Sequence, residues 1–184
     1  MTLTIITINY NNAEGLRKTL ASVASQTYSH IEHVIVDGGS TDNSVEVIRE
    51  YESTLALSPH RLIASRLKWL SEKDKGIYNA MNKGIEIALG CRIVNEDHTS
   101  SPIANNQSPI AQTDYIQILN SGDILAAPDV TERMMAALQD KIKQHQQHNI
   151  NNPSVVAQHT TTATENNTSR LSPLASRLEN HPAI

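Results

Sequence analysis

Phenylalanine is absent from this sequence of 184 residues, and five Tyr and one Trp bring the aromatic content to only 3%. A chain in which every residue packed into a core would carry more large apolar side chains, so we expect part of it to remain unpacked. The length suits one domain with a sizeable core. The single cysteine, Cys91, cannot form an internal disulfide and has no Cys or His at metal-ligand spacing, which suits a reducing cytosol.

Long apolar runs and an excess of basic residues are also missing. No stretch approaches the roughly 18 apolar residues of a membrane span, and the segment 1–8 lacks the basic and long apolar regions of a signal peptide. We therefore predict a cytoplasmic protein, and a peripheral association with the inner face of a membrane stays open. The net charge of −4 provides no field that would gather nucleic acid, so nucleic acid is not an expected partner.

Apolar strands and amphipathic helices alternate along residues 3–138. The predicted strands are residues 3–8, 31–36, 67–70 and 115–119. Predicted helices follow them, with apolar side chains at helical spacing: Leu16, Leu20 and Val23; Val45, Ile48 and Tyr51; Ile77, Met81, Ile85 and Leu89; and Val130, Met134 and Leu138. This alternation predicts an α/β fold, in which a mostly parallel sheet with right-handed crossovers is flanked by helices.

Polar residues define the expected ends of these helices. Asn11 or Asn12 can cap the first helix, and Thr41 or Asp42 the second. Gly90 is placed to end the third helix. At the start of the last helix, the segment 129–132 (Asp-Val-Thr-Glu) resembles a capping box.

Two segments have no periodicity that would give a helix or strand a buried face. Residues 91–113 are dominated by Asn, Ser, Thr, Gln and Pro, and we predict a disordered surface insertion there. From Gln139 to the end the chain is again polar and of low complexity, which predicts disorder. The expected organisation is therefore a domain of residues 1–138, containing the insertion, and a tail of residues 139–184.

Polar loops follow three of the predicted parallel strands, after Ile8, Val36 and Leu119. The carboxyl ends of parallel strands meet at one edge of a sheet, where open α/β folds bind their ligands. The groups available there include aromatic, amide and carboxylate side chains: Asn9, Tyr10, Asp37 and Asp123. They suit a nucleoside diphosphate, with a surface for the base and a carboxylate for a divalent cation. No Gly-x-Gly-x-x-Gly follows the first strand, which argues against a dinucleotide-dependent oxidoreductase.

Five segments in order resemble the signatures of family 2 glycosyltransferases, enzymes with the GT-A fold. They are Thr4–Asn11, Ser25–Tyr28, Val34–Asp42, Ser71–Gly84 and Ile118–Asp123. The resemblance covers roughly residues 3–138 apart from the insertion. It implies inverting transfer of a sugar, of hexosyltransferase type, from a nucleotide-sugar donor to a glycan or lipid-linked acceptor in cell-surface polysaccharide biosynthesis.

The resemblance also implies roles for individual residues. Tyr10 and the backbone from Thr7 to Asn9 would border the base. Asp37 would accept a hydrogen bond from the base, and Asp74 would lie near the base or ribose. The turn of Asn120, Ser121, Gly122 and Asp123, here called the Asn120–Asp123 turn, takes the place of the family's Asp-x-Asp motif. Asn120 would then touch the donor, and Asp123 would hold Mg²⁺ or Mn²⁺.

Structural interpretations remain open for the same residues. Asp37 and Asp42 could cap a helix, Asp74 could be a surface charge, Tyr10 could pack in its loop, and Asp123 could be a turn carboxylate.

The family's acceptor pocket and general base come from sequence after the metal strand, where this chain has one predicted helix and the polar tail. We therefore expect a chain that is truncated at its C-terminus, with an incomplete acceptor half, no assignable catalytic base and impaired activity. The alternative hypothesis is a non-catalytic remnant that binds nucleotides or serves as an interaction module.

Overall fold

The computed structural model describes residues 1–57, 66–102 and 113–151. The chain divides into two units, Met1–Met135 and Ala136–Ile184. In chain order the elements are β1 (Leu3–Asn9), α1 (Ala13–Ala24), β2 (Ile31–Asp37), α2 (Ser44–Leu57), β3 (Leu67–Ser71), α4 (Ile77–Ala88), β4 (Arg92–Val94), β5 (Ser100–Pro102), β6 (Tyr115–Ile118) and α5 (Val130–Asn151).

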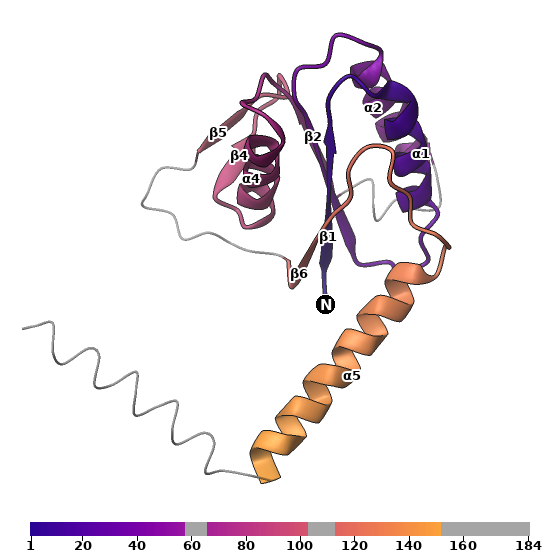
Figure 1. Cartoon of the computed structure of the whole chain (residues 1–184), viewed down its shortest axis with the longest axis vertical. Coiled ribbons are helices and arrows are strands. Elements are labelled where there is room, and N and C mark those ends of the chain that lie inside the picture. Colours follow the sequence, from indigo (N-terminus) through magenta and orange to yellow (C-terminus); the bar gives the residue numbers. More distant parts are fainter. Residues whose placement is uncertain (58–65, 103–112, 152–184) are drawn as a thin grey trace, which may run out of the picture. The chain divides into compact units, whose positions relative to one another are not determined.

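Four parallel strands form the main sheet, in the order β3-β2-β1-β6. Helices α1 and α2 cover one face of this sheet and α4 covers the other (Figure 1). The predicted α/β fold with a parallel sheet and flanking helices is confirmed.

The two central strands, β1 and β2, are buried along their whole length. Their side chains alternate between two apolar clusters, because successive residues of a strand point to opposite faces. Ile6 and Val34 pack toward α4, whereas Ile35 packs with Leu20 of α1 and Ile48 of α2. Their β-branched composition therefore suits strands that are covered on both sides.

Two predicted helix ends are confirmed. The side-chain oxygen of Asn12 accepts a hydrogen bond from the Gly15 amide at 3.2 Å and caps α1. Gly90 follows α4 with φ of 71°, and the amides of Gly90 and Cys91 return to the carbonyls of Ile87 and Glu86. This pair of bonds is a Schellman motif, which satisfies the last carbonyls of the helix.

The prediction of disorder over residues 91–113 is wrong for residues 91–102. Strands β4 and β5 pair there as an antiparallel hairpin. Arg92 donates to Glu86 at 2.7 Å, and Glu72 accepts hydrogen bonds from the amide and hydroxyl of Ser100 at 2.8 and 3.0 Å. Glu72 and Glu86, which lie outside the segment, thus stabilise residues 91–102, and the composition of the segment alone does not reveal these partners. Residues 103–112 of the predicted insertion lie outside the described residues.

Helix α5 also differs from expectation. It continues to Asn151, so the prediction of disorder from residue 139 is wrong up to that point; residues 152–184 lie outside the described part. Gln and Lys have helix propensities close to that of Leu, so a helix can form without a buried face. At the start of α5, Glu132 accepts a hydrogen bond from Thr27 at 2.6 Å, and Asp129 pairs with Arg133. These contacts are not those of the predicted capping box.

Close packing of α4 on β1 depends on Gly84, where an added Cβ would lie 2.4 Å from Cγ2 of Ile6. At an exposed helix site, Gly→Ala would stabilise by about 1 kcal/mol. We expect Gly84→Ala instead to lower the free energy of unfolding by about 1 kcal/mol, because overpacking outweighs the propensity gain. Urea denaturation measures this, with Asn82→Ala on the exposed side of α4 as the control, expected to be neutral or slightly stabilising. A Gly84→Ala protein as stable as the control would show that the Ile6 side chain can shift to make room for the added methyl group.

Candidate functional site

A pocket of about 510 Å³ opens at the carboxyl ends of the central strands. Its walls come from the loops after β1, β2, β3 and β6 together with the start of α4. The lining residues are Ile8, Asn9, Tyr10, Gly38, Lys73, Asp74, Gly76, Ile77, Asn120 and Ser121.

Backbone hydrogen bonds join the loops around this pocket. The Gly38 amide donates to the Asn9 carbonyl at 2.9 Å, and the Ser121 amide donates to the Ile8 carbonyl at 2.9 Å. The loops after β1, β2 and β6 therefore meet at one edge of the sheet, as the sequence predicted.

The structure places four of the seven predicted site residues in the pocket wall: Asn9, Tyr10, Asp74 and Asn120. Tyr10 is 65% exposed and makes an aromatic surface at the mouth. Asp123 is exposed at the end of the neighbouring turn but is not part of the wall.

Thr7 and Asp37 are completely buried, away from the pocket wall. The hydroxyl of Thr7 lies 3.0 Å from Nε2 of His33, so this side chain belongs to the core beneath the site. From the sequence alone, the core residue Thr7 could not be distinguished from the pocket residue Asn9, which lies two residues further along the same strand.

Asp37 ties the loops together with four hydrogen bonds. Its Oδ1 accepts from the Asn9 amide nitrogen at 2.8 Å and from the Ser40 hydroxyl at 2.5 Å. Its Oδ2 accepts from the Ser40 backbone amide at 2.9 Å and from the Ser71 hydroxyl at 2.7 Å. A carboxylate offers about four lone-pair positions, so these bonds use its whole capacity.

Gly38 leaves room for the two side chains that flank it. A Cβ at this position would lie 2.6 Å from Oδ2 of Asp74 and 3.3 Å from the Tyr10 ring. Gly39 has φ of 77°, a conformation that side chains rarely adopt. Gly38 thus lets the side chains of Tyr10 and Asp74 come close to the backbone of this loop, and Gly39 lets the backbone at Lys73 do so.

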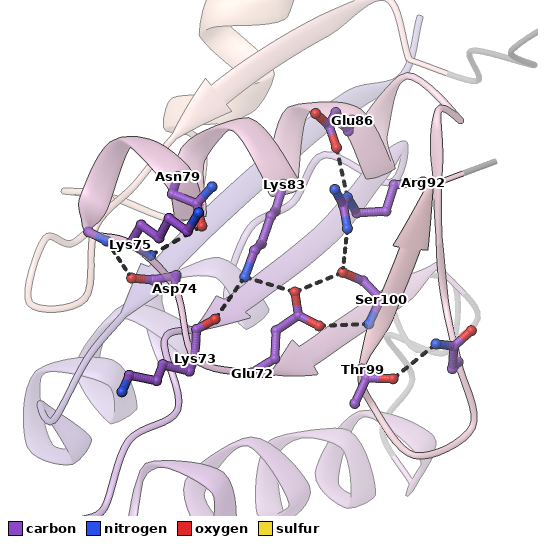
Figure 2. A network of polar contacts seen from close by, with 12 residues as sticks. Glu72, Lys73, Asp74, Lys75, Asn79, Lys83, Glu86, Arg92, Thr99 and Ser100 are labelled. Carbon is purple, nitrogen blue, oxygen red and sulfur yellow. Dashed lines mark hydrogen bonds and ion pairs between the residues drawn. The ribbon is translucent and has the colours of Figure 1, made fainter. Parts of the chain in front are cut away.

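An ion-pair network supports the loop that carries Lys73 and Asp74 (Figure 2). Lys83 of α4 pairs with Glu72 at 2.8 Å, and Glu72 also accepts from Ser100 of β5. Burial acts to raise the pKa of the Glu72 carboxyl, but the hydrogen bonds from Lys83 and Ser100 outweigh it and leave the pKa below its usual value. The charged form of Glu72 therefore fastens this loop to α4 and β5.

A polar stripe on α1 holds the Asn120–Asp123 turn. The Gly122 amide donates to the Thr19 hydroxyl at 2.9 Å, which in turn donates to the Asp123 carbonyl at 2.7 Å. Asn12 donates to the Ser121 carbonyl at 3.0 Å. From the sequence, Asn12 was expected only as a helix cap and Thr19 had no predicted role, although their spacing of seven residues places them on one face of a helix.

The turn carries two side-chain oxygen groups of the kind that bind divalent cations. Oδ1 of Asn120 is buried without a hydrogen-bond partner, and the Asp123 carboxylate lies three residues further on, exposed. Within the described ranges no group of three or more acidic, His or Cys side chains could hold a metal alone. One carboxylate and one amide oxygen nevertheless fit Mg²⁺ or Mn²⁺, which commonly takes its other ligands from substrate phosphates and water.

A parallel α/β sheet with a pocket across the carboxyl ends of its central strands is the arrangement in which open α/β folds bind their ligands. A family model described as glycosyl transferase family 2 matches residues 4–97, about half of the sequence. The chain belongs to this family.

Curated relatives include two mycobacterial proteins. An uncharacterised glycosyltransferase of Mycobacterium tuberculosis is 33% identical over 141 residues, which are 76% of this chain and 41% of that protein. A PGL/p-HBAD biosynthesis glycosyltransferase of Mycobacterium bovis is 38% identical over 86 residues, which are 47% of this chain and 30% of that protein. The chain thus spans less than half of the length of these relatives.

Solved structures with the same fold include Staphylococcus aureus TarS 1–349. It superposes with a TM-score of 0.51 at 19% identity, over 76% of this chain and 33% of that chain. A complex of the same protein with UDP-GlcNAc gives a TM-score of 0.51 at 17% identity, over 76% and 32% of the two chains. In the part of our chain that the structure describes, no helix has the length and apolar character to cross a membrane.

Proposed function

We propose that the chain binds a nucleotide-sugar donor in the pocket at the ends of β1 and β2, and that it takes part in inverting transfer of a hexose to a glycan or lipid-linked acceptor. The observation that carries this proposal is the shape and chemistry of the pocket wall. It combines an exposed aromatic ring, unpartnered amide oxygens and a lysine beside a polar turn that offers cation ligands.

Each part of the pocket suits a different part of the donor. The ring of Tyr10, with Ile8 and Ile77, offers an apolar surface on which a base can lie. Lys73, also in the wall, carries positive charge that suits a diphosphate. A bound divalent cation would supply further positive charge against the diphosphate, with Asp123 and Asn120 as its protein ligands.

Family membership and the curated relatives, rather than the pocket, support the proposed acceptor. One relative is named for PGL/p-HBAD biosynthesis. A role in cell-surface polysaccharide or glycolipid assembly, at the cytoplasmic side of a membrane, is part of the proposal. A lipid-linked acceptor would bring the protein to the membrane surface.

Titration calorimetry with UDP, GDP, dTDP and their sugar conjugates, with and without Mn²⁺ or Mg²⁺, tests the donor site. Binding of at least one nucleoside diphosphate is expected, and no binding by the whole panel would refute the donor site. Release of sugar from the donor, measured on the same chain, separates a transferase from a non-catalytic nucleotide-binding protein. Binding without any release would favour the latter.

Tyr10→Ala tests the base surface. We expect it to weaken nucleotide binding about tenfold, because stacking of a base on an aromatic ring is worth about 1–3 kcal/mol. The control is Tyr78→Ala: Tyr78 is 79% exposed on the first turn of α4 but does not line the pocket. Equal losses at the two positions, measured by calorimetry, would show that the base does not lie on Tyr10.

Asp123→Asn tests the cation site. In the wild-type chain we expect Mn²⁺ to strengthen nucleotide binding about tenfold or more, through charge neutralisation of the diphosphate. Asp123→Asn should lose this increment while binding without metal stays within a few-fold. Asp129→Asn, a nearby exposed carboxylate that pairs with Arg133, is the control. An unchanged Mn²⁺ increment in Asp123→Asn would remove this carboxylate from the cation site.

A further inference from the structure

Strand β6 forms one edge of the main sheet, beside β1 (Figure 1). The amides of Tyr115 and Leu119 donate to backbone carbonyls in or next to β1, at 3.2 and 2.9 Å. Successive residues of a strand point their backbone groups to opposite sides, so the amides and carbonyls of Ile116 and Ile118 face away from β1. Among the described residues, no strand pairs with this side of β6.

The side chains of the same two residues are apolar and accessible. Ile116 is 36% and Ile118 is 38% exposed. Ile118 lies in register with Ile6 of β1, which packs in the cluster beneath α4, so both isoleucines lie on the face of the sheet that α4 covers only in part. Strand β6 has no charged residue and no proline, which are common at sheet edges and prevent association there.

The opposite edge of the sheet, at β3, is protected. The Ser71 amide donates to the His98 carbonyl at 2.9 Å, and the His98 ring stacks on Trp69 with ring centroids 3.5 Å apart. Lys68 adds an exposed charge within the strand. A covering loop and an edge lysine both prevent pairing with another chain, and the described part of the chain provides neither at β6.

We propose that the β6 edge is a dimerisation surface, which pairs in antiparallel orientation with β6 of a second copy of this chain about a two-fold axis at Gln117. Each outward amide of Ile116 and Ile118 then meets a carbonyl of the other copy. Ile116 of one copy lies opposite Ile118 of the other on the same face of the joined sheet, where such apolar pairs stabilise strand association. This inference is independent of the proposed donor site.

The side chain of Gln117 favours a second copy over an unrelated strand. Its Oε1 is buried without a hydrogen-bond partner in the single chain. At the two-fold axis Gln117 faces its own copy in a non-hydrogen-bonded pair, the position at which opposite residues of antiparallel strands lie closest. The amide group of each copy then offers a donor to the oxygen of the other.

Sedimentation equilibrium of the full chain measures the association. Because the paired segment is short, we expect a reversible dimer with a Kd on the order of 10–100 μM. Amide hydrogen exchange at low and high protein concentration locates the interface. Exchange at Ile116 and Ile118 should slow about tenfold or more at high concentration, whereas Tyr115 and Leu119, which are bonded toward β1, should keep their rates within about twofold.

Ile116→Lys and Ile118→Pro disrupt the pairing by different routes. Lysine places charge on the edge, and proline removes an amide that makes no bond within the sheet. We expect association at least about tenfold weaker in each variant, with a cooperative urea transition showing that the dilute chain is folded. Ile93→Lys is the control, because Ile93 is 51% exposed in β4, outside the main sheet, and should keep the wild-type Kd.

A wild-type chain that stays monomeric up to about 0.5 mM overturns the inference. A dimer that folded Ile116→Lys and Ile118→Pro proteins both retain also overturns it, because the contact then lies elsewhere. Slow exchange at Ile116 and Ile118 that does not depend on concentration would show that another part of the same chain covers the edge, with the same consequence. The exchange test uses the wild type alone and so does not depend on whether either variant folds.

Discussion

Asparagine in place of Asp37 is expected to lower the free energy of unfolding by about 3 kcal/mol and to abolish measurable nucleotide binding. Four donors converge on this buried carboxylate, from Asn9, Ser40 and Ser71. Asparagine keeps one acceptor oxygen and points an amide group at the remaining donors, which are then left without acceptors. Urea denaturation at pH 7 measures the loss of stability, and calorimetry measures the loss of binding.

The control for this prediction is Asp42→Asn in the same loop. Asp42 also accepts three hydrogen bonds, from the Ala13 amide and from the amide and hydroxyl of Ser44, but it is partly exposed and does not line the pocket. We expect a cost of about 1 kcal/mol there, with nucleotide binding kept within a few-fold. If Asp37→Asn proved no more costly than Asp42→Asn, Asp37 would not be the anchor of the pocket loops.

The four strands of the main sheet and the position of the pocket could be predicted because the responsible signals are local. The β-branched run from Leu3 to Ile8 belongs to a strand that is central in the sheet, so both of its faces are covered. Polar loops at the ends of parallel strands must then gather at one edge. The pocket lies there, and Asn9, Tyr10, Asp74 and Asn120 are in its wall.

Which polar residues line the pocket and which hold its loops in place could not be predicted in the same way. Whether Asp37 faces a ligand or the protein depends on donors as far along the chain as Ser71, and on the geometry of two loops. The support of the Asn120–Asp123 turn by Thr19 spans more than 100 residues of sequence. Such contacts are set by the packing of α1 against the sheet, and motif spacing does not report them.

The errors over residues 91–102 and 139–151 have different physical origins. The hairpin of β4 and β5 is polar, but its charged and hydroxyl groups find partners in Glu72 and Glu86. Its low apolar content therefore did not mean disorder. In α5, intrinsic propensity and pairs such as Asp140 with Lys143 favour a helix where no apolar period exists. The apolar content of a segment shows how much surface it can bury. Residues 91–102 and 139–151 are held mainly by polar contacts and helix propensity, so their apolar content did not predict their structure.

The second large effect concerns His33, which makes the stability of the fold depend on pH. Its imidazole is completely buried between the hydroxyls of Thr7, at 3.0 Å from Nε2, and Tyr51, at 3.1 Å from Nδ1. Burial lowers the pKa of His33 from 6.5 to about 3 in the folded protein. The unfolded chain titrates near 6.5, so below that pH it binds a proton that the native state does not.

Stability from the neutral imidazole is therefore fully present above pH 6.5 and declines by about 1.4 kcal/mol per pH unit as the pH falls toward 3. Between pH 7.5 and pH 5.0 we expect a loss of about 2 kcal/mol, measured as the shift of the urea midpoint at constant slope. Glu72, whose pKa is lowered, adds its own loss mainly below its unfolded pKa near 4.5, outside this interval.

His33→Gln is the control, because it removes the titrating group. The free energy of unfolding of this variant should change by less than about 0.5 kcal/mol over the same interval, however stable the variant is at pH 7.5. A wild-type protein equally stable at the two pH values would mean that solvent reaches the imidazole and lets it protonate in the folded state.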